Sequence, residues 1–299
     1  MLLRTLWLSL DPYMRGRMSD APSYAKPVGI GDTMEGGTVS EVVASNLPRF
    51  GKGDIVVGRT GWQTHALSDG SGLQKVDPTR APIQTALGVL GMPGMTAYMG
   101  LLEIGKPAAG ETVVVAAASG AVGSVVGQIA RIKGCRAIGI AGGPEKCRVV
   151  TEEFGFDAAI DYREPGLRKK LRELAPRGVD VYFDNVGGEI LDTVLTCIAR
   201  GARIIICGAV SQYNEARVHG PANYMMLLVA RASMTGMLVF DYADRYPEAT
   251  AELAGWYRAG KLVSREEIVP GGVRDFPETL LMLFEGANTG KLILALEEG

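Results

Sequence analysis

Residues Val113–Gly127 read VVVAAASGAVGSVVG, an apolar run that breaks into spaced glycines and then regains helical character. This pattern predicts a strand, a tight turn and a helix. Gly120 is expected to take a backbone conformation closed to other residues, Gly123 to let the backbone approach a pyrophosphate, and Gly127 to let the helix sit close on its strand. The free amides and the positive end of the helix dipole would then face an anion. A plain glycine-rich turn is the alternative, and the flanking strand and helix argue against it.

The residues that follow the next predicted strand indicate which dinucleotide is bound. A preference for NAD(H) usually places an acidic residue there, which binds the ribose hydroxyls. Here the position is taken by Gly142–Gly143, which offers no carboxylate to repel a phosphate. Pro144 suits the first position of a helix, so Lys146 falls in the first turn and can pair with a 2′-phosphate. We therefore predict NADP(H). An ordinary solvated lysine stays open as the alternative for Lys146, and Glu145 beside it is a mild counter-argument.

Length and composition set further bounds. A chain of 299 residues can bury a large core and form two domains, one of them split. The formal net charge of −2 gives no reason to expect nucleic acid or an anionic membrane as a partner. The apolar stretches are interrupted before the length of a bilayer span, and the start lacks the order of a signal peptide, so we expect a cytoplasmic protein. The four cysteines and two histidines are widely spaced, which suggests neither a disulfide framework nor a zinc cluster.

The first eighty or so residues have the pattern of short strands joined by Gly and Asp turns, which predicts a small barrel-like domain. From Pro82 the pattern becomes helical. Strands and helices then alternate regularly, which predicts a doubly wound parallel α/β sheet that binds its ligand at the carboxyl ends of the strands. The predicted strands are Thr112–Ala117, Arg136–Ile140, Ala158–Asp161, Val179–Asp184 and Arg203–Cys207.

Thr235–Phe240 is predicted as a further strand, either in the sheet core or as an edge that pairs with the same strand of a second subunit. Tyr246–Ala259 and Phe276–Gly286 are predicted helices. The last apolar run, Gly290–Leu296, is predicted to return as a strand to the first domain, which makes that domain discontinuous. The expected domains are 1–87 for substrate binding and catalysis, 88–262 for NADP binding, and 263–299 for the return to the first domain.

Six motifs distributed over the chain belong together. They are Leu8–Arg15 (LSLDPYMR), Gly91–Tyr98 (GMPGMTAY), Ala117–Gly123, Phe183–Gly188 (FDNVGG), Cys207–Asn214 (CGAVSQYN) and Asn288–Lys291 (NTGK). With them the chain resembles the zinc-independent medium-chain dehydrogenases/reductases, in the branch of the leukotriene B4 dehydrogenases, prostaglandin reductases and curcumin reductases. The resemblance implies a Rossmann-like domain, a discontinuous GroES-like β-barrel domain, and NADPH-dependent reduction of a carbon–carbon double bond conjugated to a carbonyl.

The chain departs from the family pattern at its start. Relatives have further strands ahead of the segment that begins here at Leu2, so we expect the barrel domain to be shortened at its N-terminus. Zinc-dependent relatives carry a histidine in a Gly-His-Glu run, and the corresponding Gly31–Gly37 has none, so no metal site is predicted. Carbonyl polarisation would then come from hydroxyl donors, amides and the cofactor's ribose.

The resemblance implies three groups of cofactor-binding residues. The pyrophosphate group is Gly120, Ala121, Val122 and Gly123. The 2′-phosphate group is Lys146 and Tyr162. The group around the ribose and nicotinamide is Asn185, Cys207, Gly208, Ala209, Val210, Ser211, Tyr213, Leu238, Val239, Phe240 and Asn288.

Two tyrosines are the candidates for chemistry and substrate binding. Tyr213 is expected to donate a proton to the developing oxyanion, because a phenol with a reference pKa of about 10 is protonated at neutral pH; a ring that packs on the cofactor is the alternative. Tyr13, by resemblance, lines the pocket of a small-molecule enone or enal, and a turn aromatic packed on the barrel is its alternative. An NADPH quinone reductase and a non-catalytic NADPH-binding protein remain as rival functions, and we expect a homodimer through Thr235–Phe240.

Overall fold

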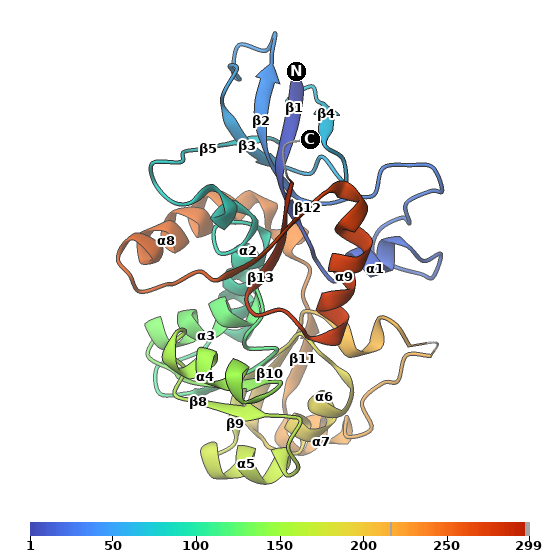
Figure 1. The fold of residues 1–299 in the computed structure, drawn as a ribbon. Helices are drawn as coiled ribbons and strands as arrows, with labels where there is room; N and C mark the ends of the chain where they lie inside the picture. The colour runs from blue at the N-terminus through green and yellow to red at the C-terminus, as the bar shows by residue number, and fades with distance from the viewer. Residues whose placement is uncertain (216, 297–299) are drawn as a thin grey trace. The chain divides into compact units, whose positions relative to one another are not determined.

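The middle of the chain, Met92–Ser264, forms one unit, and the two flanking segments, Met1–Gly91 and the chain from Arg265 onward, form another. The computed structural model describes residues 1–215 and 217–296 (Figure 1).

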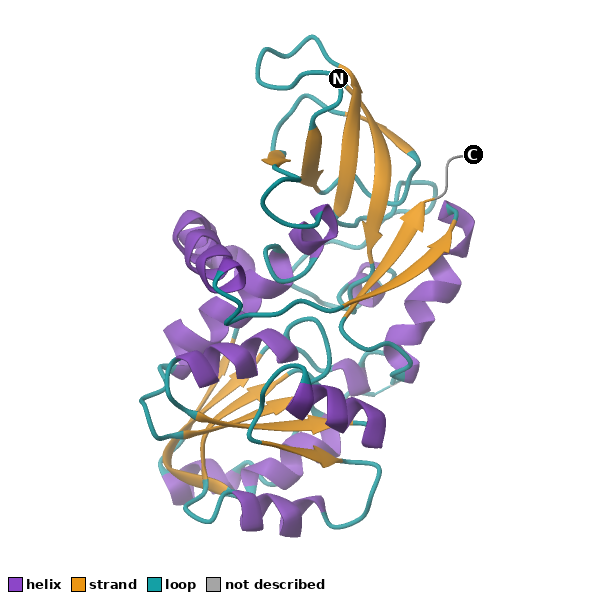
Figure 2. Cartoon of the chain, turned by 60° about the vertical axis from the view of Figure 1, so that its left-hand side comes forward, coloured by secondary structure: helices purple, strands orange, loops and turns teal. Residues whose placement is uncertain are grey.

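The middle unit contains a six-stranded sheet in which every pairing is parallel. Its order is β11-β10-β9-β6-β7-β8, with helices on both faces (Figure 2). The predicted doubly wound α/β sheet is thus confirmed. The strands are β6 (Thr112–Ala116), β7 (Arg136–Ala141), β8 (Ala158–Asp161), β9 (Val179–Asp184), β10 (Ile198–Ile206) and β11 (Ser233–Gly236).

The strand order reverses beside β6, because β7 and β8 follow on one side of it and β9 to β11 on the other. Ligands of open α/β sheets bind at such a switch point, outside the carboxyl ends of the strands. Val113–Ala116 within β6 is fully buried, as expected for a strand covered on both faces. The site is therefore expected in the turns that follow β6, β7, β9 and β10.

The helical elements of the middle unit connect these strands. They are α2 (Met92–Met99), the π-helix η2 (Gly100–Gly105), α3 (Gly123–Ile132), α4 (Pro144–Glu152), α5 (Leu167–Leu174), α6 (Gly188–Leu195), η3 (Val210–Gln212), α7 (Met225–Ala230), η4 (Val239–Arg245) and α8 (Tyr246–Arg258).

The predicted strand Thr235–Phe240 is wrong in its second half. β11 ends at Gly236, and the 3-10 helix η4 starts at Val239. The reason is the end of its partner, since the parallel register stops at the pair Ile206 and Gly236. Beyond Ile206 the chain of β10 turns into a loop, so Leu238 stays extended without a neighbouring strand to pair with.

The flanking segments build a seven-stranded mixed sheet in the order β12-β13-β1-β2-β3-β5, with β4 paired to β1. The C-terminal strand β13 pairs with the N-terminal strand β1, so the chain returns to its first sheet as predicted. The strands are β1 (Leu2–Ser9), β2 (Thr38–Ala44), β3 (Ile55–Gly58), β4 (His65–Leu67), β5 (Gln74–Val76), β12 (Glu266–Gly271) and β13 (Lys291–Leu296).

Helix α9 (Phe276–Glu285) covers part of this sheet and supplies Phe276 to its apolar core. The ring of Trp62 packs on Phe276 with the ring centroids 3.5 Å apart. The remaining helical elements of this unit are short: α1 (Met14–Arg17), η1 (Ile83–Leu87) and η5 (Val273–Asp275).

Candidate functional site

The turn between β6 and α3 owes its shape to residues other than the one expected. The left-handed residue is Ala117, with φ of 51°, whereas Gly120 has no positive φ, so the special conformation predicted for Gly120 is wrong. The Gly120 amide instead donates to the Ala117 carbonyl over 2.9 Å. Gly123 is needed for space, because a Cβ there would lie 2.3 Å from the same carbonyl oxygen. The turn therefore leads directly into α3, where the amide of Ser124 donates to the Gly120 carbonyl over 3.0 Å and that of Val125 to the Val122 carbonyl over 3.1 Å.

Gly127 provides space on α3, as predicted, but the neighbour for which it makes room is a different one. A Cβ at Gly127 would lie 1.8 Å from Cζ of Phe156, whose ring precedes β8. The close contact of α3 is thus made with this ring rather than with its own strand.

The turn after β7 carries the predicted Gly142–Gly143 pair at the place where an acid would bind ribose hydroxyls. Gly143 has φ of 92°, and helix α4 begins at the next residue, Pro144. Lys146 is half-buried in the first turn of that helix. A Cβ at Gly142 would lie 3.1 Å from the hydroxyl oxygen of Tyr162, the residue directly after β8. The structure therefore brings Lys146 and Tyr162 to the carboxyl ends of two neighbouring strands.

Asp161, the last residue of β8, holds this turn in place. Its Oδ1 accepts the amide of Gly143 over 2.8 Å and the amide of Arg163 over 2.9 Å. Desolvation opposes the charge, but the two amides lower the pKa of Asp161 below its ordinary value. A charged carboxylate thus links the turn after β7 to the turn after β8.

Asp184, the last residue of β9, is fully buried. Its Oδ1 accepts the Tyr182 hydroxyl over 2.9 Å and the amides of Val186 and Gly187, each over 3.0 Å. Oδ2 has no hydrogen-bond partner among the described residues. Burial raises the pKa of this carboxyl, and the three hydrogen bonds oppose that change. The side chain fixes the start of the turn in which Asn185 lies.

The loops after β9 and β10 are joined by main-chain hydrogen bonds. The Asp184 carbonyl accepts the amides of Cys207 over 2.9 Å and Gly208 over 3.1 Å, and the Asn185 carbonyl accepts the amide of Val210 over 3.2 Å. The Asn185 side chain donates to the Ala116 carbonyl over 2.9 Å, at the end of β6. Asn185 and the loop that starts at Cys207 are therefore brought together at the switch point.

Tyr213 folds back over the same loop. Its hydroxyl oxygen accepts the amide of Ala209 over 3.2 Å, and Gly208 leaves room for it, because a Cβ there would lie 3.2 Å from this oxygen. A phenol that accepts one hydrogen bond still carries its own proton, which it can donate to a second partner. Burial raises the pKa of the neighbouring Cys207 thiol to about 12, so this cysteine is neutral and unsuited to nucleophilic attack.

The predicted residues Leu238–Phe240, which begin two positions after the end of β11, differ in their surroundings. Leu238 is extended and half-buried, Val239 is buried at the start of η4, and Phe240 is 41% exposed. The predicted set Leu238–Phe240 therefore belongs to a strand end and a helical turn, where the side chains point in different directions than they would in one strand.

Two predicted site residues lie in the unit built from the flanking segments. Tyr13 stands at the start of α1 and packs on the core that contains Phe276, while the Arg17 guanidinium lies 5.6 Å from the centre of its ring. Burial, and then the charge of Asp11, raise the pKa of Tyr13, so its hydroxyl is protonated. Asn288 precedes β13, and its side-chain amide donates to the Gly290 carbonyl over 3.0 Å.

Arg163 is a residue that the sequence analysis missed. A Cβ built on Gly142 would lie 3.1 Å from Arg163 Nε, and one on Gly143 would lie 3.7 Å from Nη1. Its guanidinium therefore lies over the turn that also receives Tyr162. The available signal was a basic residue directly after Tyr162, at the end of a predicted strand.

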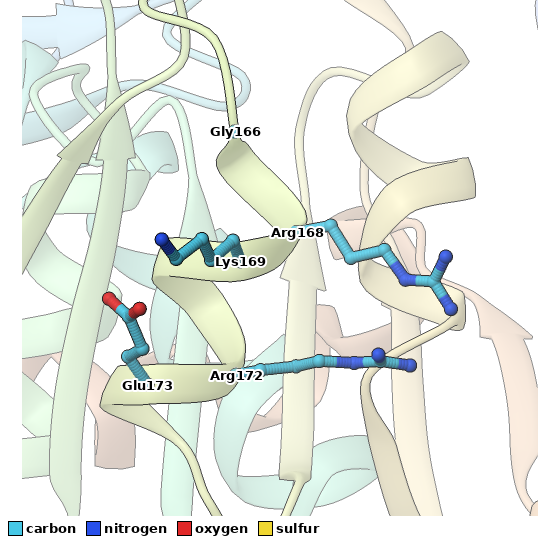
Figure 3. A pocket seen from close by; sticks show the side chains of 5 residues that line it. All are labelled: Gly166, Arg168, Lys169, Arg172 and Glu173. Carbon is cyan, nitrogen blue, oxygen red and sulfur yellow. The ribbon is translucent and has the colours of Figure 1, made fainter.

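A hollow of about 490 Å³ lies elsewhere on the middle unit (Figure 3). In Figure 3 the arginines project from one side of α5, and Lys169 and Glu173 from the other. None of the predicted site residues lines it, so the hollow is distinct from the turns described above. Its lining residues are Gly166, Arg168, Lys169, Arg172 and Glu173.

Across residues 1–215 and 217–296, no three His, Cys, Asp or Glu side chains form a group that could hold a metal ion. No helix in this part of the chain is both long and apolar enough to cross a membrane.

Comparison with known proteins places this geometry among oxidoreductases. Residues 1–76 match a family model described as the N-terminal domain of oxidoreductase, and residues 121–255 match one described as zinc-binding dehydrogenase. The chain is 48% identical to the NADPH-dependent curcumin reductase of Escherichia coli (strain K12), with 98% of this chain and 86% of that protein covered. It is 42% identical to a 2-alkenal reductase (NADP(+)-dependent) of Nicotiana tabacum, with 98% and 86% covered.

The fold agrees with these matches. The crystal structure of CurA in complex with NADPH from Vibrio vulnificus has a TM-score of 0.94 to this chain at 48% identity. The match covers 100% of this chain and 90% of that one.

Proposed function

This chain belongs to the zinc-independent medium-chain dehydrogenases/reductases, and from that membership we propose that it is an NADPH-dependent reductase of α,β-unsaturated aldehydes and ketones. The observation that carries the proposal is the turn after β7, where Gly142–Gly143 replaces the acid of NAD-preferring enzymes beside Lys146. The relatives matched over almost the whole chain are NADPH-dependent curcumin reductase and an NADP-dependent 2-alkenal reductase.

The residues present fit NADP(H). A Cβ at Gly123 would clash with the Ala117 carbonyl, so the glycine lets the turn close tightly before α3, whose N-terminal end we propose faces the pyrophosphate. Lys146 and Tyr162 are our proposed partners of the 2′-phosphate, and both lie beside Gly142–Gly143, the position at which NAD-preferring enzymes carry an acid. We assign the pyrophosphate to residues 120–123 and the ribose and nicotinamide to Asn185 and the loop from Cys207 to Tyr213.

The chain's own residues then have to orient the reacting groups and stabilise the enolate. Bound NADPH supplies the hydride that adds to the β-carbon of the conjugated double bond. The residues hold the reacting carbons about 3 to 3.5 Å apart and stabilise the enolate that forms. We propose that the Tyr213 hydroxyl donates to the enolate oxygen, because the Ala209 amide orients the phenol oxygen and a phenol can accept one hydrogen bond while it donates another.

The two units divide the work in this proposal. The middle unit, Met92–Ser264, binds NADP(H), and the unit of the flanking segments contributes Tyr13 and Asn288. Tyr13 presents a protonated hydroxyl from a turn that is packed on an apolar core, which suits an enone or enal with one polar end.

The experiment is a turnover assay that follows consumption of NADPH with trans-2-nonenal and with curcumin, beside a quinone and an NADH control. Turnover of the enones with NADPH, and much less with NADH, is the expected result. Turnover of the quinone alone would favour an NADPH quinone reductase. Tight binding of NADPH without turnover of any substrate would favour a non-catalytic binding protein.

We propose a homodimer that pairs through the edge strand β11. This strand stands at the end of the sheet order, and α7, just before it, exposes Met225, Leu228 and Val229 by 51%, 69% and 59%. A second copy would cover both the free strand edge and this apolar face. Light scattering of the eluted protein is expected to give twice the chain mass of 31.7 kDa, and Thr235→Pro to give the monomer.

We also propose a cytoplasmic location. The four cysteines of the chain are free thiols, a state that reducing compartments maintain. Fractionation of cells that express the chain at its native level tests this proposal.

A further inference from the structure

Arg163 occupies a place where an anion with two or three oxygens would meet several donors at once. Its guanidinium lies over Gly142 and Gly143, within 3.1 Å and 3.7 Å of where their side chains would start. The hydroxyl of Tyr162 reaches the same point over Gly142. Helix α4, which packs beside β8, begins there at Pro144, so its positive dipole end adds to the field (Figure 1).

The position of Arg163 is set by a hydrogen bond that does not use its guanidinium. The backbone amide of Arg163 donates to Asp161 Oδ1, which also accepts the amide of Gly143. The start of the arginine side chain is therefore held at a constant distance from the glycine turn. The Arg163 side chain itself is exposed, and its charge is one of the influences that lower the pKa of the Asp161 carboxyl.

We propose that Arg163 binds the 2′-phosphate of NADP(H) together with Lys146 and Tyr162, and that it is a determinant of the preference over NAD(H). The proposal rests on the function proposed above. A phosphate monoester presents oxygens that match the fork of a guanidinium, whereas an ammonium offers a single point of charge. Arg163 thus adds direction to a site in which Lys146 supplies charge.

The glycines are part of the same arrangement. A Cβ at Gly142 would lie tight against both Arg163 Nε and the Tyr162 hydroxyl, each 3.1 Å away, so both groups would have to shift slightly. The absence of a Cβ leaves the guanidinium and the phenol side by side over bare backbone. The double glycine therefore does more than omit an acid, since it gives the two donors room to converge.

The test is calorimetric titration of the purified full chain with NADPH and with NADH, which measures binding without turnover. Arg163→Gln is expected to weaken the binding of NADPH about tenfold and to leave that of NADH unchanged. Arg163→Lys is expected to lie between the wild type and Arg163→Gln, because it keeps the charge without the fork.

The control removes the same charge from the far end of β7, the strand that leads into the glycine turn. Arg136 is exposed at the start of β7, about 16 Å along the strand from its carboxyl end. Arg136→Gln is expected to bind both cofactors as the wild type does. Repeating the titrations with 2′,5′-ADP and 5′-AMP restricts the comparison to the adenosine half of the cofactor.

The outcomes distinguish the role of Arg163 from the proposed cofactor preference. Unchanged binding of NADPH by Arg163→Gln would overturn the role of Arg163 and leave the proposed function standing. Equal losses for NADPH and NADH would also overturn it, because the residue would then be structural. A wild-type chain that binds NADH as tightly as NADPH would overturn the proposed cofactor preference itself.

Discussion

The Lys291 ammonium lies 2.8 Å from Oδ1 of Asp11, a residue 280 positions away, and both side chains are buried. The same nitrogen donates to the Leu10 carbonyl over 2.6 Å, and the Ser9 hydroxyl donates to the other oxygen of Asp11. The last strand is thereby tied to the end of the first. Tyr13 follows two residues after Asp11, so the place of this candidate substrate residue depends on the pair.

Lys291→Met is expected to lower the free energy of unfolding by about 3 to 5 kcal/mol, because it leaves the buried Asp11 carboxylate without a counter-charge. Urea unfolding measures this loss. Lys75→Met is the matched control, since its ion pair with Asp54 is exposed to solvent and contributes little to stability. Similar losses in the two variants would contradict the importance of burial.

Lys146→Ala is expected to weaken NADPH binding about tenfold with little change for NADH, because one charge-assisted contact to the 2′-phosphate is lost. Fluorescence titration with each cofactor measures the two dissociation constants. Lys169→Ala, which removes an exposed charge from α5, serves as the control (Figure 3). A loss that is equal for both cofactors would rule out a contact with the 2′-phosphate.

Tyr213→Phe is expected to lower kcat about a hundredfold and to leave the affinity for NADPH unchanged, because the hydroxyl acts once charge develops on the substrate oxygen. Steady-state kinetics with an enone, beside titration with NADPH, separates the two effects. Tyr257→Phe in α8 removes a hydroxyl far along the chain and is expected to be silent. Weakened NADPH binding with unchanged kcat would instead identify Tyr213 as a ring that packs on the cofactor.

Asp184 makes the free energy of unfolding depend on pH. Burial raises the pKa of this carboxyl above its ordinary value of 3.8 in the folded chain, so the folded state binds more protons than the unfolded state between the two values. The free energy of unfolding therefore falls as the pH rises through that interval. Asp184→Asn is expected to remove this contribution.

Urea unfolding of the wild type and of Asp184→Asn between about pH 4 and pH 7 tests the sign. The advantage of the wild type over the variant is expected to be greatest at the acidic end and to shrink toward neutrality. A constant difference across the range would mean that Asp184 titrates alike in both states.

Gly127→Ala is expected to destabilise the chain by about 1 to 3 kcal/mol, because the new methyl group would meet the Phe156 ring 1.8 Å away. Gly255→Ala is the control within another helix, where nothing lies within 4 Å of the added atom. That change is expected to stabilise the chain by about 0.5 to 1 kcal/mol, through helix propensity alone. Thermal unfolding of both variants measures the two changes in stability, which are expected to have opposite signs.

The sheet of the middle unit was predictable because its strands carry their own signals. β6 and β9 are short apolar runs bounded by turns, and the order of a doubly wound sheet follows from the handedness of its crossovers. The end of β11 was not predictable, since it depends on where its neighbour β10 stops. Apolar sequence alone does not record the length of the partner.

The site was predictable in its residue types and less so in its contacts. Gly142–Gly143 and Lys146 are visible in the sequence as a missing acid and an added cation. The sequence did not indicate the left-handed conformation at Ala117, and the guanidinium of Arg163 over the glycine turn depends on a hydrogen bond through Asp161. The local sequence pattern does not indicate such contacts between turns.

The position of β13 between β12 and β1 also bears on how the chain is made. A ribosome delivers the N-terminal strands first, yet their central neighbour emerges among the last residues. The continuous segment Met92–Ser264 can complete its sheet while still tethered, whereas Trp7–Ser9 of β1 must wait with an unpaired edge for about 280 further residues. The unit that contains β1 is thus completed after the middle unit.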